Sequence, residues 1–480
     1  MKDLLVMKFG GTSVGSAERM RVAAQISAEQ LRKRPTLIVV SAMSKVTDLL
    51  IDAMRHAEAG DRTGLEAGMR AVEQRHAQAC RELLPESHRA AAMAGIEELL
   101  TAFRRITGGM LMLNERPPRS VDEALSIGER LSALLIASYL QSQGVRADAF
   151  NAAEVIVTDA VFGNASPVME ATREKARERL RPLLDEGILP VVTGFNGATA
   201  DGRPTTLGRG GTDFSASILA ASLDAAELWI WTDVDGIMTA DPRLVSEARV
   251  LSEVTYSEAA ELAYNGAKVL HPRTLEPLAD REIPVWSKNS FALDKPGTRI
   301  VSKIETSSGA RAVTSTAKVA LISMEPSTAS LMGSQVMGRA LDALARANVE
   351  ALALSSSSFR QSFCFLVRSE ELRAALQGLE AALALELAHG YLSPIDVDDD
   401  VGLLAVVGEG MRGTPGLAGR IFTAISRESV NIIAIAQGSS ELTISIVVRR
   451  DGLEKAVRAV HQECRMGEDS PNVQSRVLPA

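Results

Sequence analysis

The stretch MKFGGTSVGS, at positions 7–16, ends an apolar run with a lysine and a phenylalanine, which two glycines and two hydroxyl residues follow. Glycines after a strand let backbone N–H groups approach an anion without interference from a Cβ, and Thr12 and Ser13 add hydroxyl donors. In a P-loop the lysine follows the glycines, whereas here a serine occupies that place. The stretch predicts an anion site in which the charge of Lys8 comes from the strand. A plain Gly-Gly turn beside a solvated lysine is the alternative.

Around this stretch, the first 300 residues alternate short apolar runs with helical patterns. Five runs indicate strands: Leu4–Phe9, Thr36–Val40, Ile188–Val192, Glu227–Trp231 and Ile283–Ser287. Helices are expected at Ala17–Arg34, Asp48–Ala59, three segments between about Gly64 and Gln141, Met169–Asp185 and Thr212–Ser222. This alternation predicts an α/β fold, with an open and mostly parallel sheet sandwiched by helices.

The last third of the chain has a different pattern. Residues 301–316 are small, polar and without periodicity, and they predict a linker. After them, KVALISM, a helix and SFCFLV are echoed by LLAVV, a helix and TISIVV, with Asn348 and Asn431 in the same context. We interpret this echo as two copies of a βαββ-type unit. The predicted domains are therefore 1–300, a linker at 301–316, and two α+β units at 317–392 and 400–470.

Composition limits the classes of partner that we expect the protein to bind. The formal charge is −8 and the basic residues are scattered, so neither nucleic acid nor an anionic membrane is an expected partner. Cys80, Cys364 and Cys464 lie far apart, which argues against a disulfide framework or a zinc site. The chain shows neither a signal peptide nor a membrane-length apolar run. We expect a soluble cytoplasmic protein that binds small molecules and has no metal site built from its side chains.

A second motif is GFNGATADGRPTTLGRGGTDFSAS, at positions 194–217. Arg209 lies within a glycine turn and can grip a carboxylate or phosphate with two parallel donors. Thr212 is a good N-cap for the helix that follows, and Asp213 falls in its first turn. Asp213 either complements the helix dipole or fixes the ammonium groups of nearby lysines.

A third motif is WTDVDGIMTADPR, at 231–243, where a strand end leads into turns that suit a nucleotide base and ribose. Ordinary loop chemistry explains the same residues as well. Further on, NGAKVLHP at 265–272 contributes Lys268 near the end of an expected helix. His271 is read as structural and is given no catalytic role.

Five motifs in order resemble those of aspartate kinases, in the amino acid kinase superfamily. They are KFGGTSV at 8–14, LGRGGTD at 207–213, TDVDGI at 232–237, DPR at 241–243 and GAKVLHP at 266–272. The resemblance implies a catalytic domain followed by two ACT domains. It also implies ATP-dependent phosphorylation of the L-aspartate β-carboxylate to 4-phospho-L-aspartate, the first step towards lysine, threonine and methionine.

The resemblance assigns roles to individual residues. It places the ATP phosphates on Lys8, Gly10, Gly11, Thr12 and Ser13, and further nucleotide contacts on Thr232, Asp233, Arg243 and Lys268. It places the substrate on Ser41, Thr47, Glu129, Phe195 and Arg209. Arg209 suits the α-carboxylate and Glu129 the α-ammonium, which leaves the β-carboxylate facing the γ-phosphate. Met238 stands where several relatives have a tyrosine, so a thioether replaces a hydroxyl near the nucleotide.

The chemistry needs no general base, because an aspartate carboxylate with a pKa of about 3.9 is already ionised at neutral pH. Catalysis then consists of positioning and charge neutralisation. Lys8, Lys268, the glycine N–H groups and Mg²⁺ would offset the charge of the transferring phosphoryl group. Arg209 orients the substrate, and Asp213 is expected to organise the lysines.

The C-terminal region contains Gly408, Gly410 and Gly413 in a GxGxxG spacing. Alone this spacing would indicate a dinucleotide fold, but the unit is short and Gln437 and Gly438 stand where a ribose-binding acid belongs. An ACT loop, where an effector amino acid and a neighbouring subunit approach the backbone, explains these glycines better.

The expected effector is an amino acid, with threonine favoured over lysine. Lysine-regulated relatives often have an acid that pairs with the ammonium of a lysine ligand. In an alignment on Asn348, Leu352 occupies the position of that acid, and Glu350 is the only acid nearby that could replace it. The segment around NIIAIAQGSSE resembles the threonine-sensitive branch. The residues expected to bind the effector are Gln437, Asn431 and Gly416.

Other expectations follow from the resemblance. ACT domains pair across subunits, so a homodimer or homotetramer is expected. A homoserine dehydrogenase extension is expected to be absent, because the chain ends at Ala480. Two alternatives stay open, namely a kinase for another small carboxylate or a nucleotide, and a non-catalytic amino-acid sensor that keeps the kinase fold.

Overall fold

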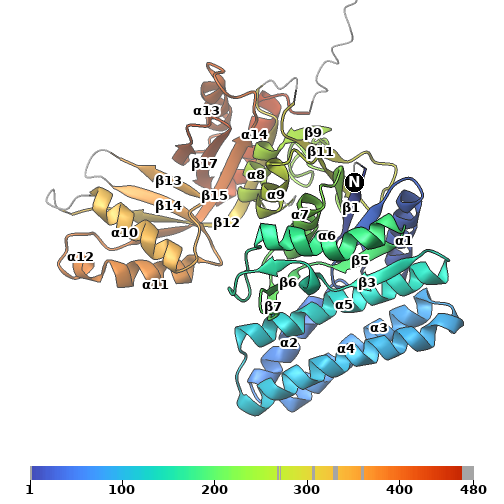
Figure 1. The fold of residues 1–480 in the computed structure, drawn as a ribbon. Coiled ribbons are helices and arrows are strands. Elements are labelled where there is room, and N and C mark those ends of the chain that lie inside the picture. Colours follow the sequence, from blue (N-terminus) through green and yellow to red (C-terminus); the bar gives the residue numbers. More distant parts are fainter. Residues whose placement is uncertain are drawn as a thin grey trace, which may run out of the picture. The chain divides into compact units, whose positions relative to one another are not determined.

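The structure, a computed structural model, describes residues 3–267, 270, 272–304, 309–327, 333–357 and 362–467. These residues form two compact units (Figure 1). Unit 1 lies within 1–237, 252–256 and 270–303, and unit 2 lies within 238–251, 257–269 and 304–480.

Unit 1 is built on an eight-stranded sheet in the order β3-β5-β2-β1-β8-β10-β11-β9. The strands are β1 Leu5–Phe9, β2 Thr36–Val40, β3 Ala147–Phe150, β5 Leu189–Thr193, β8 Glu227–Thr232, β9 Glu253–Thr255, β10 Val285–Asn289 and β11 Thr298–Val301. All neighbours run parallel except β10 and β11. The mostly parallel sheet predicted from the apolar runs is confirmed.

Helices follow most strands of unit 1. They are α1 Ala17–Leu31, α2 Val46–Glu58, α3 Arg62–Leu83, α4 Glu86–Leu113, α5 Pro118–Ser142, α6 Met169–Asp185, α7 Gly211–Ser222 and α9 Pro272–Ala279. In Figure 1, α3 and α4 form a long light-blue hairpin. A separate three-stranded sheet consists of β4 Val157–Thr158, β6 Asn196–Thr199 and β7 Pro204–Thr206.

The alternation of β1 decides which face each side chain meets. Leu5, Met7 and Phe9 join one core with the helices α1 to α5. Because successive side chains point to opposite faces of a strand, Lys8 lies on the other face, where α7 packs against β1. Lys8 is paired in register with Val39 and Ile230, so the carboxyl ends of β1, β2 and β8 meet at one edge of the sheet.

Unit 2 contains a six-stranded antiparallel sheet in the order β13-β14-β12-β15-β17-β16. Its strands are β12 Ala312–Met324, β13 Ala353–Ser356, β14 Phe363–Arg368, β15 Asp396–Val407, β16 Ile432–Gln437 and β17 Thr443–Arg449. Its helices are α10 Gly333–Arg346, α11 Leu372–Ala382, α12 Ala384–Ala388, α13 Leu417–Arg427 and α14 Leu453–Glu463, and α8 Tyr256–Tyr264 lies mostly in the same unit. The two predicted α+β units are present.

The long strands β12 and β15 belong to both α+β units. The first half of β12, at 312–316, pairs with 403–407, whereas its second half pairs with the start of β15. Val313 packs in the core of the second α+β unit, and Ile322 packs in the core of the first α+β unit. Within unit 2, the first α+β unit is therefore inserted into the second. The predicted linker is wrong for its last five residues, 312–316, which belong to β12. Their small and polar side chains show no strand pattern, and their strand conformation depends on pairing with β15.

The repeat register also differs from the expected one. Asn348 and Ser429 both have left-handed φ, 55° and 58°, after α10 and α13. The next residue returns a hydrogen bond to its helix in both copies, Val349 N–H to Leu344 and Val430 N–H to Ile425. Asn348 thus corresponds to Ser429 and not to Asn431. The identity of Asn348 and Asn431 was misleading, because the equivalent positions share a backbone conformation and not a residue type. The residue after each helix has a left-handed φ, which asparagine adopts in one copy and serine in the other.

Two segments from the predicted 1–300 domain pack within unit 2. Thr239 O accepts the N–H of Val313, and Thr239 Oγ1 lies 3.0 Å from His461 Nε2. Glu258 pairs with Arg311 at 3.0 Å. The compact unit that carries the antiparallel sheet therefore includes residues 238–251 and 257–267.

Candidate active site

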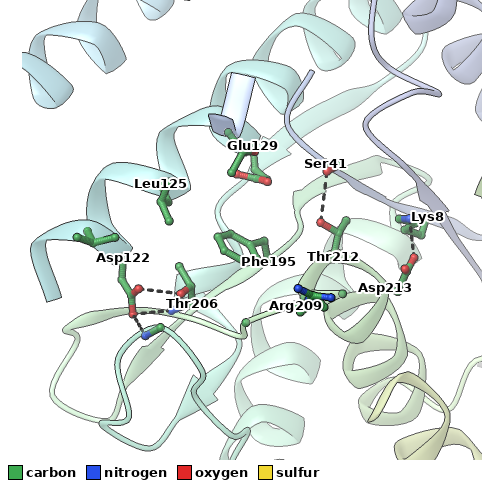
Figure 2. Close-up of a pocket in the computed structure, with 16 residues that line it drawn as sticks. Lys8, Ser41, Asp122, Leu125, Glu129, Phe195, Thr206, Arg209, Thr212 and Asp213 are labelled. Carbon is green, nitrogen blue, oxygen red and sulfur yellow. Dashed lines mark hydrogen bonds and ion pairs between the residues drawn. The ribbon is translucent and has the colours of Figure 1, made fainter. Parts of the chain in front are cut away.

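A cavity of about 500 Å³ opens in unit 1 beside the carboxyl ends of the parallel strands. Figure 2 shows that its side chains come from the β1 strand, from α5, from the Phe195 turn and from the start of α7. Seven of the residues expected to take part in binding or catalysis line it: Lys8, Ser41, Thr47, Glu129, Phe195, Arg209 and Asp213. Residues 200 apart in the chain thus share one site, as expected at this edge of a parallel sheet.

The loop after β1 is shaped by its glycines. A Cβ on Gly11 would lie 3.1 Å from the carbonyl oxygen of Ala42, and a Cβ on Gly10 would lie 3.2 Å from Lys8 Nζ. Ser44 N–H donates to Gly11 O, which ties this loop to the end of β2. The absence of a Cβ therefore allows the loop after β1 to pack closely against the backbone at Ala42.

Ser13 differs from the expectation that its hydroxyl serves phosphate. The residue is 1% exposed, and its Oγ lies 2.8 Å from Ser290 Oγ and 3.3 Å from the carbonyl oxygen of Trp231. Arg19 also donates to Ser290. The Ser13 side chain thus holds the loop after β1 against the ends of β8 and β10, whereas the neighbouring Thr12 is exposed.

Lys8 and Asp213 form the ionic centre of the cavity. Lys8 Nζ lies 2.5 Å from Asp213 Oδ1, with side chains only 10% and 18% exposed. The two charged groups therefore form a largely buried ion pair. Asp213 lies in the first turn of α7, on the sheet face from which Lys8 projects.

The start of α7 corrects one detail of the sequence analysis. The N-cap is Gly210, with a left-handed φ of 71°, and not Thr212. Thr212 lies within the helix and its Oγ1 donates weakly to Ser41 Oγ at 3.5 Å (Figure 2). Gly208 is also left-handed, with φ of 76°. These two glycines bend the chain so that Arg209 lines the cavity.

Phe195 occupies the middle of the cavity wall in an unusual conformation. Its φ is 70°, and Asn196 N–H donates to Gly194 O across it, which is a γ-turn with positive φ. This turn is rare and strained for a side chain larger than glycine. The Phe195 carbonyl accepts from Leu207 N–H, so the turn also anchors the Arg209 loop.

Glu129 is buried on α5 with an unused acceptor. Its Oε1 accepts the N–H of Ala42 at 3.2 Å, while Oε2 has no partner among the described residues. Burial raises the pKa of Glu129 from 4.5 to about 8. A cationic ligand group beside this carboxylate would restore its charge and supply the missing partner.

Asp122 was not identified from the sequence, although it lines the same cavity. It is buried on α5, seven residues before Glu129, and it accepts hydrogen bonds from Thr206 and Gly163. The one available signal was the spacing of two acids by two helical turns, which places them on one face. The Asp122 partners lie far along the chain and could not be found from the sequence.

The expected nucleotide residues are spread more widely. Thr232 ends β8 next to the loop after β1, and its Oγ1 donates to Asp233 at 3.3 Å. Arg243 lies in unit 2, exposed and paired with Asp241 at 2.5 Å. Met238 also lies in unit 2, in an isolated bridge with Val250. Lys268 lies outside the described residues.

The expected effector residues lie on the second α+β unit. Gln437 and Asn431 are exposed at and near β16, and Gly416 caps α13 with φ of 82°. A cavity of about 420 Å³ in the same sheet is lined by other residues, mainly serines of β13 and its neighbours together with Glu325 and Asp396.

Two further findings concern membranes and metals. Within the part of the chain that the structure describes, no helix is both long and apolar enough to cross a bilayer. The same residues contain no group of three or more histidine, cysteine or acidic side chains placed to hold a metal ion.

Comparison with family models gives two matches. The amino acid kinase family matches residues 3–289, and an ACT domain matches residues 404–464. The first match covers the loop after β1 and the whole cavity.

Known proteins and structures agree with the family matches. Lysine-sensitive aspartokinase 3 of Escherichia coli is 32% identical, over 96% of this chain and 99% of that protein. Bifunctional aspartokinase/homoserine dehydrogenase 1 of Arabidopsis thaliana is 34% identical over 95% of this chain but 50% of its own length. The chain thus spans about half the length of the first curated relatives it matches. The crystal structure of E. coli aspartokinase III with aspartate and ADP superposes with a TM-score of 0.82 and 30% identity, covering 96% and 99% of the two chains.

Proposed function

The chain belongs to the amino acid kinase family and within it to the aspartokinases, and on this premise we propose that it is an aspartate kinase. It would transfer the γ-phosphoryl group of ATP to the β-carboxylate of L-aspartate, giving 4-phospho-L-aspartate. The observation that carries the proposal is the buried Glu129 with its unpartnered oxygen, in one cavity with Arg209 and Lys8. A relative solved with aspartate and ADP supports the choice of ligands.

The cavity contains the groups that an α-amino acid requires. Glu129 would accept the α-ammonium, since its Oε2 needs a donor and no described residue supplies one. Arg209 would hold the α-carboxylate through two parallel N–H donors. With both ends of the head group fixed, the β-carboxylate is left for the phosphoryl group. Ser41, Thr47 and Phe195 would enclose the substrate.

Phosphoryl transfer would rely on charge neutralisation. The β-carboxylate is ionised at neutral pH and attacks without a base. Lys8 and the N–H groups after Gly10 and Gly11 would meet the phosphates as the bond to ADP breaks. Asp213 would hold Lys8 in place through the observed ion pair. Thr232, Asp233, Arg243 and Lys268 stay proposed nucleotide contacts.

Mg²⁺ fits this site as a partner of the nucleotide. The described residues offer no cluster of three ligating side chains, and Asp213, the carboxylate beside Lys8, already pairs with that lysine. Mg²⁺ commonly keeps several waters and binds substrate phosphates with few protein ligands. When bound, it would neutralise charge on the β- and γ-phosphates.

Regulation by an amino acid is the second part of the proposal, with threonine favoured over lysine. Glu350, the acid nearest to the replaced position, already pairs with Arg368 at 3.3 Å. Leu352 packs against an apolar cluster, so the expected counter-charge for a lysine ammonium is absent there. A relative solved with lysine and aspartate keeps lysine as the competing candidate. Glu325 and Asp396, which line the 420 Å³ cavity, are acids that could receive its ammonium.

Hydroxylamine trapping of acyl phosphate tests the function. The full chain is incubated with ATP, Mg²⁺ and either L-aspartate, L-glutamate or N-acetylglutamate, with and without threonine or lysine. Hydroxamate formed selectively from aspartate, and reduced by threonine, supports both parts. Selective turnover of another acid would support the alternative kinase. Tight threonine or lysine binding without turnover of any acid would support the sensor and contradict the kinase proposal.

Assembly and location complete the proposal. A homodimer or homotetramer formed through the ACT units, and a cytoplasmic location, are proposed on the strength of the family alone. Sedimentation of the purified chain with and without effector tests the first.

A further inference from the structure

Asp122 holds together two segments that line the substrate cavity. Its carboxylate is 1% exposed, and three donors surround it (Figure 2). Oδ2 accepts the N–H of Thr206 at 2.9 Å and the N–H of Gly163 at 2.8 Å, and Oδ1 accepts the Thr206 hydroxyl at 2.7 Å. One carboxylate on α5 thereby fixes the end of β7 and the loop before α6.

Both segments determine where Arg209 lies. Thr206 ends β7, three residues before Arg209. The Gly163 loop lies directly against the turn that presents Arg209, because a Cβ on Gly208 would come within 2.5 Å of Asn164 Oδ1. Thr206 O also accepts the N–H of Ala165 at 2.8 Å. Releasing the Asp122 contacts would therefore loosen the Arg209 turn from two sides.

The same helix carries the group proposed to bind the other end of the substrate. Asp122 and Glu129 are seven residues apart on α5, about two turns, and both line the cavity. A rigid helix thus sets the separation between Glu129 and the turn of Arg209. That separation must match the distance between the α-ammonium and the α-carboxylate of an amino acid.

We propose that Asp122 is a positioning residue, whose three hydrogen bonds fix the Arg209 turn relative to Glu129 and thereby set the affinity for the amino-acid substrate. The inference rests on the proposed function. Asp122 would act through geometry, because its acceptors are all used by the protein's own donors. It would not touch the substrate.

Asparagine can reproduce this geometry without the charge. Its carbonyl oxygen in the Oδ2 position would accept both N–H groups, and its amide would donate to the Thr206 hydroxyl, which can also accept. Alanine removes all three bonds and leaves the donors buried. The pair Asp122→Asn and Asp122→Ala therefore separates position from charge, and Thr206→Val removes a single bond as a milder variant.

The test combines kinetics with amide hydrogen exchange on the full chain. We expect Asp122→Ala to raise KM for aspartate about 10-fold or more, as for lost hydrogen bonds to a charged group, with KM for ATP within about twofold. Asp122→Asn should recover most of the affinity, and Thr206→Val should raise KM for aspartate by a smaller factor. Amides of Gly163 and Thr206 should exchange faster in Asp122→Ala and stay protected in Asp122→Asn.

Several outcomes would overturn the proposal. One is Asp122→Ala with unchanged exchange and unchanged KM for aspartate. Another is Asp122→Asn as impaired as Asp122→Ala despite protected amides, which would assign the charge a direct role. If Asp122→Ala does not fold, an unaltered KM for aspartate in Thr206→Val would overturn it. Absence of aspartate turnover in the wild-type chain would refute only the proposed function, because the exchange comparison still reports whether Asp122 fixes the two segments.

Discussion

Lys8 and Asp213 lie 205 positions apart in the sequence, yet their charged groups meet at 2.5 Å in the cavity. The contact exists because Lys8 projects from the β1 face on which α7 packs, and Asp213 occupies the first turn of that helix. An ammonium held in this way is fixed in direction, as the proposed contact of Lys8 with the ATP phosphates needs. Such preorganisation is what charge stabilisation in phosphoryl transfer requires.

The first prediction concerns this pair. Lys8→Ala should lower kcat for acyl phosphate formation by at least about 100-fold, because it removes a charge aimed at the transferring group. Asp213→Asn should lower kcat by a smaller factor than Lys8→Ala, because Lys8 is still present but is less well oriented. Steady-state kinetics of the two variants and wild type provide the measurement. Equal kcat in Lys8→Ala and wild type would contradict the role given to Lys8.

The second prediction concerns stability at the site. Because burial raises the pKa of Glu129 to about 8, the unfolded chain ionises this residue above about pH 4.5 while the folded protein keeps it protonated. Folding is therefore disfavoured progressively between about pH 4.5 and 8, by up to about 1.4 kcal/mol per pH unit. Glu129→Gln should have a higher Tm than wild type at pH 8 and a similar Tm at pH 4.5. A Tm difference that does not grow with pH would contradict it.

The third prediction concerns substrate affinity. An α-ammonium pairs with ionised Glu129, so the KM for aspartate should fall as pH rises from 6 towards 8, by up to about tenfold per unit. Above pH 8 the KM should level off. Glu129→Gln should show a higher KM without this slope, measured with ATP saturating at each pH. A wild-type KM constant from pH 6 to 8 would show that Glu129 is already ionised in the free enzyme.

The fourth prediction concerns the strained turn. Phe195→Gly should relieve the positive φ of 70° but remove the ring from the cavity wall. We expect little loss of Tm, because the relieved strain offsets part of the lost packing, together with a raised KM for aspartate. Phe195→Ala keeps the strain and loses the ring, so it should be less stable than Phe195→Gly. Thermal melting of the two variants tests this order of stability. A higher Tm for Phe195→Ala than for Phe195→Gly would contradict the claim that the turn is strained.

The fifth prediction concerns unit 2. Glu258 is buried, pairs with Arg311 at 3.0 Å and accepts the N–H of Glu409 at 2.9 Å. Arg311→Met should remove an ionic contact of a buried carboxylate and lower the free energy of unfolding by about 3–5 kcal/mol. The double variant with Glu258→Gln should recover much of this loss. Chemical denaturation of both variants gives the measurement, and an additive loss in the double variant would argue against coupling.

Much of the fold could be predicted because its central strands are wholly buried. β1, β2 and β5 are five-residue, mostly apolar strands that are buried throughout, and α6 has the predicted bounds. The strands β3, β6 and β7 were missed since ADAF, NGAT and PTT contain no apolar run. Their pairing depends on neighbours that the local sequence does not reveal.

The site was predictable where a backbone requirement leaves a mark in the sequence. The glycines around Arg209 and after Lys8 are such marks, since they permit left-handed turns or close loop packing. Asp122 left only the seven-residue spacing to Glu129 as a signal, because its hydrogen-bond partner Thr206 lies 84 positions away. The contact of Ser13 could not be found from the sequence either, since its Oγ lies 2.8 Å from that of Ser290, which follows β10 and is 277 positions away.

The central claim is that the β-carboxylate of L-aspartate attacks the γ-phosphorus of ATP. Phosphorus NMR of the product formed from L-aspartate labelled with ¹⁸O in the β-carboxylate tests it most directly. The account predicts one acyl phosphate, formed in equal amount with ADP, whose signal is shifted by ¹⁸O in the bridging position. Inorganic phosphate and ADP without an acyl phosphate, or an acyl phosphate without the isotope shift, would contradict it.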